Sequence, residues 1–340
     1  MPELPDVEVY RERLLALLGG QVLKRVRLAN VFVLRTYDPP ISALEGKRVL
    51  GFRRLGKRIV FVFEDELFMV VHLMIAGRFL MREQGAPIPK RLGLAGFDFE
   101  NATLVLTEAG TTRRASIYLV RGEAALAKLS RGGIEPLEMT LDEFAGALTS
   151  ENHTLKRSLT DPRLFSGIGN AYSDEMLHDA KLSPVKLTSR LTPEEIARLY
   201  EACRASLTAW MDRLRREAGD GFPEKVTAFR PDMAVHGKYG QPCPVCGTKV
   251  QRIRYASNEV NYCPRCQTDG KVLADRGLSR LLGTDWPRSI DEFEEIEATR
   301  ATTHTPAKES APVKAAPPAK AGAVPVEKKS RAKPAKGKKP

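Results

Sequence analysis

The stretch CPVCGTKVQRIRYASNEVNYCPRC, residues 243–266, contains two Cys-x2-Cys pairs separated by sixteen residues. Two pairs at this spacing allow a β-hairpin to bring four thiolates to one tetrahedral zinc ion. Gly247 follows the second cysteine and permits the tight turn that the first pair needs. Because four cysteine ligands close the coordination sphere, the sequence predicts one structural zinc ion rather than a hydrolytic one. Its expected ligands are Cys243, Cys246, Cys263 and Cys266.

Two alternatives are that one Cys-x2-Cys pair is redox-active, or that the cysteine spacing arose by chance. Both alternatives require the occurrence of two such pairs close together to be accidental. In a cytosolic chain, paired cysteines indicate metal before disulfide. The fifth cysteine, Cys203, lies in a helical pattern and is expected to be a small buried apolar residue. The hairpin between the pairs carries Arg252 and Arg254, which make its tip a candidate site for phosphate contacts. A solvated hairpin edge would have the same composition.

The charge of the chain is uneven. The 340 residues carry a formal net charge of +12 at pH 7. Residues 301–340 contain ten Lys or Arg residues against Glu309 and Glu327, a net of +8, which leaves +4 for residues 1–300. Such an excess fits a polyanionic partner such as nucleic acid. Because no stretch reaches the about eighteen apolar residues of a membrane span and no signal segment opens the chain, we expect a cytoplasmic protein without membrane contact.

The N-terminal part of the chain reads as one helix followed by strands. Residues 5–20 show one apolar face that starts near Pro5 and stops at Gly19-Gly20, which predicts a helix. Residues 21–120 contain short runs rich in Val, Ile and Phe that are broken by Gly, Asn, Asp or Pro. Runs this close leave no room for crossover helices, so an antiparallel sandwich or barrel is expected. Among these predicted strands are VFVLRTY (31–37), RIVFVFED (58–65) and ATLVLTEAG (102–110).

From about residue 122 the apolar period becomes helical, and the last long predicted helix ends at GDGFP (219–223). From about residue 299 the chain is rich in Ala, Lys and Pro, and we predict disorder because it cannot bury enough apolar surface. These changes divide the chain into a β-sandwich domain (1–121), a helical domain (122–235), a zinc ribbon (236–270), a helical extension (271–298) and a disordered tail (299–340).

Several motifs occur together and in order, from PELPDVE at residue 2 through RRLGKRIVF, VHL, TTRRAS, TLKRSLTD and GIGNAYSDE to the zinc ribbon. In this combination the chain resembles the formamidopyrimidine-DNA glycosylase and endonuclease VIII family of bacterial base-excision repair enzymes, from residue 2 to about residue 267. The resemblance implies an α+β fold. An N-terminal helix would lie on an antiparallel β-sandwich, followed by a helical domain with a helix-two-turn-helix motif and a four-cysteine zinc ribbon.

The resemblance also implies a chemistry for the first residues. If Met1 is removed, Pro2 exposes a secondary amine, and an α-amine has a reference pKa of about 8, so part of it is neutral and nucleophilic. In the family this amine attacks the sugar C1′, displaces the base and leaves an iminium. Glu3 matches the acid that protonates the sugar ring oxygen. Lys57, in LGKRIV, matches a β-hairpin lysine that faces the lesion.

Three further residues match positions that contact DNA in the family. His72 and Asn170 match residues that bind phosphates beside the flipped nucleotide, and Lys156 matches a lysine near the lesion. Asn170 follows GIG and starts a predicted helix, whose N-terminus is a ready anion site. Without the resemblance, His72 would be interpreted as a core histidine. Glu175 matches a buried carboxylate that is more structural than catalytic.

The chain departs from the family where the inserted side chains are expected. Base excision from a duplex requires the nucleotide to be extruded and the hole to be filled. The family inserts a methionine and an Arg-Phe pair, whereas this chain has Ile75 at the methionine position and Ala115 at the phenylalanine position. Ile75 is still expected to act as an apolar wedge, and Arg113 and Arg114 are retained. Asn258 replaces an arginine of the family's ribbon.

We therefore expect a glycosylase with abasic-site lyase activity on oxidised bases. Its expected partner is damaged double-stranded DNA, and no small-molecule cofactor is expected. The protein itself is expected to be a monomer in the bacterial cytoplasm, associated with the nucleoid. Two alternatives stay open. One keeps the enzyme class but changes the substrate to oxidised pyrimidines, abasic sites or single-stranded lesions, because residues 219–240 match neither subfamily's capping loop. The other is a non-catalytic zinc-ribbon protein that binds damaged DNA.

Overall fold

The computed structural model describes residues 1–110, 112–224, 226, 230–255, 258–283 and 286–303. The predicted disordered tail lies outside these residues from position 304 onward. The chain begins with helix α1 (Leu4–Leu18), as the apolar face predicts. Val7, Tyr10, Leu14 and Leu18 are fully buried, and the helix ends at the predicted glycines, with Gly19 as its C-cap.

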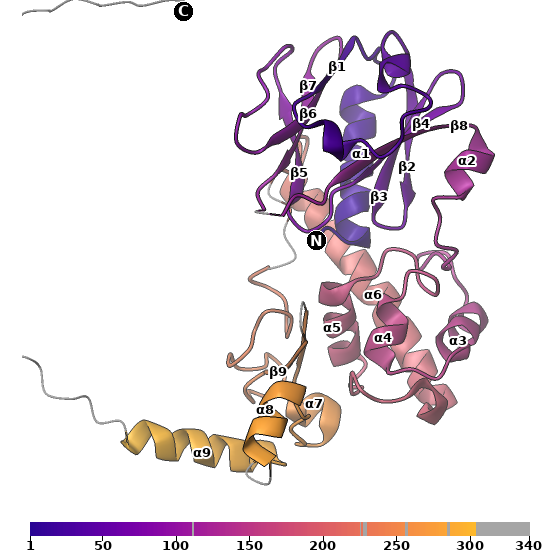
Figure 1. Ribbon diagram of the computed structural model, residues 1–340. Coiled ribbons are helices and arrows are strands. Elements are labelled where there is room, and N and C mark those ends of the chain that lie inside the picture. Colours follow the sequence, from indigo (N-terminus) through magenta and orange to yellow (C-terminus); the bar gives the residue numbers. More distant parts are fainter. Residues whose placement is uncertain (111, 225, 227–229, 256–257, 284–285, 304–340) are drawn as a thin grey trace, which may run out of the picture. The chain divides into compact units, whose positions relative to one another are not determined.

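The strands that follow α1 form a β-sandwich of two antiparallel sheets (Figure 1). The core between them is aromatic: the Phe61 ring lies 5.9 Å from that of Phe79 and 6.5 Å from that of Phe97. The predicted antiparallel sandwich is therefore confirmed. One sheet has the order β1 (Arg25–Leu28), β6 (Gly93–Asp98), β7 (Thr103–Glu108) and β5 (Gly77–Arg82), and the other has the order β2 (Val49–Leu55), β3 (Arg58–Phe63), β4 (Leu67–His72) and β8 (Ser116–Arg121).

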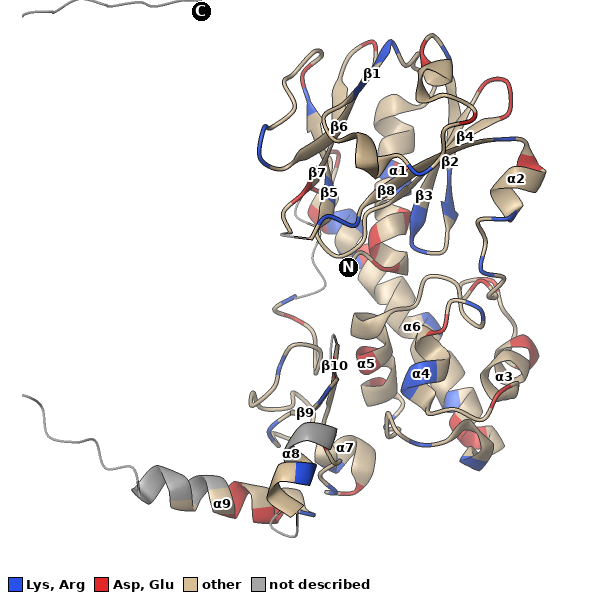
Figure 2. Ribbon diagram, in the orientation of Figure 1, with Lys and Arg blue, Asp and Glu red and all other residues tan. Residues whose placement is uncertain are grey.

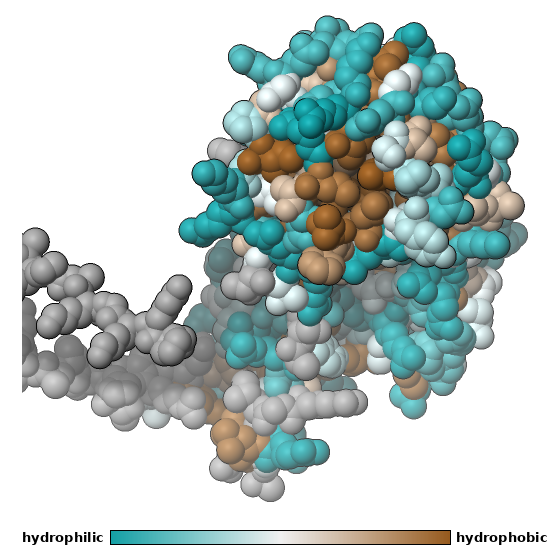
Figure 3. Space-filling view, turned by 45° about the horizontal axis from the view of Figure 1, so that its top comes forward, coloured by the Kyte–Doolittle hydropathy of each residue, from teal (hydrophilic) through white to brown (hydrophobic). Residues whose placement is uncertain are grey.

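One predicted strand is wrong. Residues 31–37 do not form a strand; Val31–Val33 form the 3-10 helix η1. The Asn30 side chain accepts a hydrogen bond from the Phe32 N–H at 3.0 Å, and this local bond turns the backbone away from an extended course. The side chains of Val31 and Phe32 are exposed. Figure 3 shows that apolar residues also gather on one face of the sandwich surface.

A helical region follows the sandwich. It comprises α2 (Glu123–Ala127), α3 (Leu141–Thr149), α4 (Leu155–Thr160), α5 (Asn170–Asp179), the 3-10 helix η3 (Thr188–Arg190) and α6 (Pro193–Ala218). Capping boxes formed by Thr140 with Glu143 and by Thr192 with Glu195 start α3 and α6. Cys203 of α6 is fully buried in the core, as predicted.

The C-terminal region contains the ribbon hairpin, β9 (Gln251–Arg254) and β10 (Glu259–Tyr262), which is followed by α7 (Pro264–Thr268), α8 (Arg276–Leu282) and α9 (Ile290–Thr303). Helix α9 ends at Thr303, a few residues beyond position 299, near which the tail was expected to begin. None of the described helices is long and apolar enough to cross a membrane.

Candidate functional site

The four paired cysteines converge on one point. Their Sγ atoms all lie within 4.8 Å of one another, with 3.4 Å between Cys246 and Cys263 and 3.9 Å between Cys243 and Cys266. Zinc–sulfur bonds of about 2.3 Å in a tetrahedron require sulfur–sulfur distances of about 3.8 Å, so the cluster fits one zinc ion. The cysteines are free thiols, not disulfides. Gly247 has φ +76°, the left-handed turn conformation that glycine favours.

Glu3 lies at the N-terminus of α5. One carboxylate oxygen, Oε1, accepts the Ala171 N–H at 3.0 Å, and Oε2 accepts the Tyr172 N–H at 3.3 Å. The Glu3 side chain is buried, and its own N–H donates to Asp6 Oδ2 at 3.0 Å. The first amides of α5 and its dipole both favour a negative charge at this position. The residue next to the N-terminus is thereby fixed against a helix that lies about 170 residues further along the chain.

Lys57 occupies the turn between β2 and β3 and reaches the same place. This turn uses Gly56 at φ +62°, and the Arg54 guanidinium donates to the Gly56 carbonyl at 3.2 Å. A Cβ atom on Gly169 would lie 2.3 Å from Lys57 Nζ and 2.4 Å from Glu3 Oε1. The two side chains therefore share the space above Gly169, which only glycine leaves open. Burial lowers the pKa of Lys57 below its ordinary value.

A pocket of about 360 Å³ opens beside this pair. Met1, Lys57 and His72 line it together with the chain from residue 129 to residue 133. Pro2 is buried next to the pocket, and burial lowers the pKa of the amino group of Met1. An amine at this end of the chain therefore loses its proton more readily than in water, which favours nucleophilic chemistry.

His72 ends β4 at the pocket wall. Its Nδ1 accepts the Met74 N–H at 3.1 Å, so the imidazole proton sits on Nε2. Burial, with Arg58 and Lys57 nearby, lowers the pKa of His72 to about 4. The ring is consequently neutral at physiological pH and offers one N–H donor.

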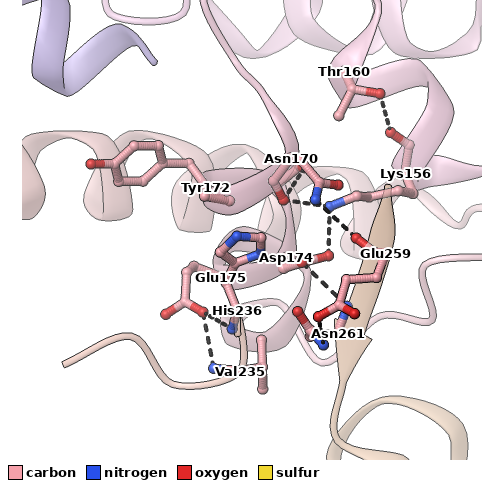
Figure 4. Close-up of polar contacts among 12 residues, drawn as sticks. Lys156, Thr160, Asn170, Tyr172, Asp174, Glu175, Val235, His236, Glu259 and Asn261 are labelled. Carbon is pink, nitrogen blue, oxygen red and sulfur yellow. Dashed lines mark hydrogen bonds and ion pairs between the residues drawn. The ribbon is translucent and has the colours of Figure 1, made fainter. Parts of the chain in front are cut away.

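Lys156 and Asn170 belong to a polar network between α4, α5 and the ribbon (Figure 4). Lys156 is buried, and its Nζ donates to the Asn170 carbonyl at 2.6 Å and to Asp174 at 2.5 Å. Asp174 also accepts from His236 Nδ1 at 2.8 Å and from the Asn261 N–H at 3.2 Å. The network holds β10 against α5 with each charge compensated.

The Asn170 side chain is directed to the ribbon as well. Its Nδ2 donates to the Glu259 carbonyl of β10 at 2.8 Å. Asn170 nevertheless lines a second pocket, of about 540 Å³, with Lys156, Tyr255 and Asn258. Figure 2 shows basic residues both at the β2–β3 turn and on α4. Lys57 of the turn lines the first pocket, and Lys156 of α4 lines the second. The charge pattern suits an anionic ligand.

Glu175 fixes the segment that leads into the ribbon. Its carboxylate accepts the backbone N–H groups of Ala234, Val235 and His236 at 2.7 to 2.9 Å. Burial raises its pKa, while these three bonds favour the charged form. The carboxylate is directed at the backbone, in agreement with the structural role that was expected.

Three regions of the chain match known domains. Residues 1–114 match the formamidopyrimidine-DNA glycosylase N-terminal domain, residues 133–213 the formamidopyrimidine-DNA glycosylase H2TH domain, and residues 240–268 the zinc finger found in FPG and IleRS. Formamidopyrimidine-DNA glycosylase of Thermus thermophilus is 35% identical over 282 residues, which cover 79% of this chain and 100% of that protein. The chain belongs to the formamidopyrimidine-DNA glycosylase family. Its cysteine cluster is the site of one structural zinc ion.

Solved structures agree with this assignment. The MutM (Fpg) protein from Thermus thermophilus has a TM-score of 0.66 at 34% identity, covering 78% of this chain and 98% of that chain. MutM in complex with DNA that contains carbocyclic 8-oxo-G has a TM-score of 0.70 at 25% identity, covering 78% and 100%. An uncharacterised formamidopyrimidine-DNA glycosylase-like protein of Mycobacterium tuberculosis is 41% identical over 150 residues, 44% of this chain and 93% of that protein.

The residues expected to contact the lesion and its surroundings differ in how exposed they are. Ile75, in the loop after β4, is 63% exposed, as an inserted side chain must be. Arg113 lies on the surface, where its guanidinium donates to the Arg91 carbonyl. The N–H groups of Arg114 and Ala115 both donate to Glu108, and Ala115 is buried in the sandwich core. Position 115 of this formamidopyrimidine-DNA glycosylase relative therefore presents no side chain to the surface.

The two hairpin arginines also differ. The Arg252 guanidinium lies 4.1 Å from the centre of the Tyr239 ring and 3.4 Å from Glu259, so neighbouring side chains already engage it. Arg254 is exposed, and its backbone N–H donates to Asp275. Of the two, Arg254 is the more exposed, since the Arg252 side chain is 31% exposed.

Sequence reasoning missed the residues that hold this site together. Gly169 looked like part of a turn, and Asp174 and His236 carried no local signal, because their partners lie between 18 and 87 residues away. The available clue was chemical: an acid inside the apolar-rich stretch AYSDEML must find a partner when it is buried.

Proposed function

We propose that the protein excises oxidised bases from duplex DNA and then cleaves the strand at the abasic site, with the amine of Pro2 as nucleophile. The observation that carries this proposal is the convergence of Glu3 and Lys57 above Gly169, beside the pocket that the N-terminus lines. Three solved relatives are complexes whose DNA contains an abasic site, Fapy-dG or carbocyclic 8-oxo-G. They support damaged DNA as the partner.

The proposed reaction begins after removal of Met1. The neutral Pro2 nitrogen forms a bond to C1′ of the damaged nucleotide while the C1′–base bond breaks, and the departing base takes a proton from water. The Glu3 carboxylate takes the proton that the Pro2 nitrogen then loses and passes it to the ring oxygen as the sugar opens, which gives an iminium between Pro2 and C1′. Loss of a proton from C2′ then expels the 3′ phosphate, and water hydrolyses the iminium to release the enzyme.

Other residues receive roles that follow from their contacts. The neutral His72 donates its Nε2–H to a phosphate beside the flipped nucleotide, and Lys57 places a cation beside the reacting sugar. Asn170 contacts the flanking phosphate at the start of α5. Lys156 is a positioning residue rather than a DNA contact, because Asp174 and the Asn170 carbonyl already bind its ammonium group.

The first test is borohydride trapping with duplexes that carry an abasic site, 8-oxoguanine or an oxidised pyrimidine. Wild-type protein, Pro2→Gly and Glu3→Gln would be compared, with the N-terminal mass measured for each. We expect a covalent adduct at residue 2 that is lost or strongly reduced in Pro2→Gly. Wild-type protein with a free Pro2 that binds these duplexes but forms no adduct would instead support the non-catalytic DNA-binding alternative.

A second candidate concerns the substrate. Ala115 lies in the core, so the protein has no aromatic side chain at position 115 to contact the base opposite the lesion. This favours a lesion range that is less dependent on the opposite base and includes single-stranded or abasic sites. Single-turnover excision opposite each of the four bases, and in a single strand, measures this. Rates that vary by less than about threefold with the opposite base support it, whereas discrimination of about a hundredfold contradicts it.

A further inference from the structure

We propose that His178 is a positioning residue of the zinc centre, where its Nε2–H donates a hydrogen bond to the thiolate of Cys243. His178 lies in the last turn of α5 and is 3% exposed. Its Nε2 is 3.3 Å from Cys243 Sγ, a hydrogen-bonding distance for a sulfur acceptor. Helix α5 thereby contributes a donor to the metal centre although it supplies none of the four ligands.

The direction of this bond follows from the other ring nitrogen. Nδ1 of His178 is buried and has no hydrogen-bond partner among the described residues. The Asp179 carboxylate is 4.0 Å from it, beyond hydrogen-bond range. A proton on Nδ1 would be buried without an acceptor, so the neutral ring with its proton on Nε2 is the state that fits. The N–H of that state faces the sulfur.

Such a bond has a clear role at a four-thiolate site. Zinc with four cysteine thiolates carries a net charge of −2, and here two of the sulfur ligands, Cys243 and Cys263, belong to buried residues. A donor beside Cys243 spreads that charge, keeps the thiolate deprotonated and fixes its orientation. Loss of contacts of this kind typically weakens metal binding by about tenfold or more.

A second contact attaches the ribbon to the chain just after α5. Gln267 Nε2 donates to the Leu182 carbonyl at 3.0 Å, while its Oε1 accepts the Cys263 N–H at 2.8 Å. One cysteine of each pair is therefore tied to the region of α5, Cys243 by His178 and Cys263 through Gln267. Since Ala171 and Tyr172 at the other end of α5 hold Glu3, the helix connects the metal centre to the candidate catalytic carboxylate.

The test compares zinc-loaded wild-type protein with His178→Phe, which keeps a planar ring but removes the N–H. His153→Phe is the matched control, because His153 pairs with Glu151 and has no hydrogen bond to the described residues of the ribbon. Zinc transfer to a chromophoric chelator is expected to show zinc binding weakened about tenfold in His178→Phe and unchanged in the control. In cobalt-substituted protein, the sulfur-to-cobalt charge-transfer bands should shift only in His178→Phe. Zinc retention within about twofold of wild type would overturn the proposal.

A measurement on the unaltered protein keeps the proposal testable if His178→Phe does not fold. Long-range 1H–15N spectra of the zinc-loaded full chain distinguish the two neutral tautomers and the charged ring of each histidine. We expect His178 to be neutral with its proton on Nε2. A neutral ring with the proton on Nδ1, or a charged ring, would overturn the proposal whatever the variant shows.

Discussion

Lys57 and Lys156 both bring an ammonium group to the start of α5, and they differ in what surrounds it. The Lys156 amine contacts Asp174 and the Asn170 carbonyl, inside a network in which each charge has a partner. The Lys57 amine forms no hydrogen bond or ion pair with the described residues, and burial lowers its pKa. The Glu3 carboxylate lies beside it above Gly169, but α5 amides already bind that carboxylate.

The comparison shows that a buried lysine can be either a structural residue or a residue available to a ligand, depending on its contacts. A buried lysine with a carboxylate partner is a structural element, because removal of either partner leaves a charge without compensation. A desolvated lysine without such a partner adds little to stability and remains available to a ligand. The motif match placed both lysines near the lesion, and only their contacts separate the two roles.

The largest effect is expected from Lys156→Met. This change leaves Asp174 buried with His236 and the Asn261 N–H but without a cation held next to it, and it should lower the free energy of unfolding by about 3 to 5 kcal/mol. Urea denaturation at pH 7 measures it. If the loss stays below about 1 kcal/mol while excision fails, Lys156 acts on DNA directly and the distinction between the two lysines disappears.

Asp6 extends the comparison to a carboxylate. Burial raises the pKa of Asp6 to about 6, although the Glu3 N–H and the Arg230 guanidinium contact it. Between its unfolded value near 4 and 6, the folded state binds more protons, so the contribution of Asp6 to stability is present below about pH 4 and is lost as pH rises through 6.

Wild-type stability relative to Asp6→Asn should therefore fall by up to about 3 kcal/mol between pH 4 and pH 7. Denaturation midpoints of both proteins across this range give the difference. A constant difference would mean that the carboxyl of Asp6 ionises as in the unfolded chain.

Lys57→Met should separate activity from stability. We expect single-turnover excision to fall about a hundredfold, because one preorganised charge beside the reacting sugar is lost. The free energy of unfolding should change by less than about 1 kcal/mol, since no ion pair is broken. A variant as unstable as Lys156→Met would show that Lys57 is a structural residue after all.

Gly169→Ala should give a smaller loss. The new Cβ would lie 2.3 Å from Lys57 Nζ and 2.4 Å from Glu3 Oε1, so both side chains must shift by about 1 Å to reach ordinary contact distance. We expect excision to fall about tenfold, with the circular dichroism spectrum unchanged. Gly146→Ala is the matched control, because nothing lies within 4 Å of a Cβ at that position. Equal rates in both variants would show that the space above Gly169 does not limit the reaction.

The parts of this protein that could be predicted from the sequence are those with local patterns. Cysteine spacing predicted the zinc ligands, and apolar periodicity predicted the sandwich and α6. The strand expected at 31–37 failed because a single Asn30 bond outweighed the strand propensity of Val and Phe.

The candidate site was predictable only in part. Motif matches identified Glu3 and Lys57, but the close approach that requires Gly169 depends on three segments meeting in space. The contacts of Lys156, and the His178 bond to Cys243, join residues 14 to 65 positions apart, and such pairings produce no periodic pattern in the sequence. The sequence therefore identified the residues of the candidate site better than it predicted the contacts between them.

Helix α5 joins residues that leave the ribosome at very different times. Glu3 is among the first to emerge, its partners Ala171 and Tyr172 come much later, and the β10 strand that Asn170 contacts follows another 89 residues on. Contacts of such long sequence separation form slowly. A nascent chain thus carries its third residue without a binding partner through most of synthesis, and the arrangement around Glu3 is completed only after the ribbon has been made. Rare codons or pauses before residue 266, the last of the four zinc ligands, would therefore delay assembly of the whole site.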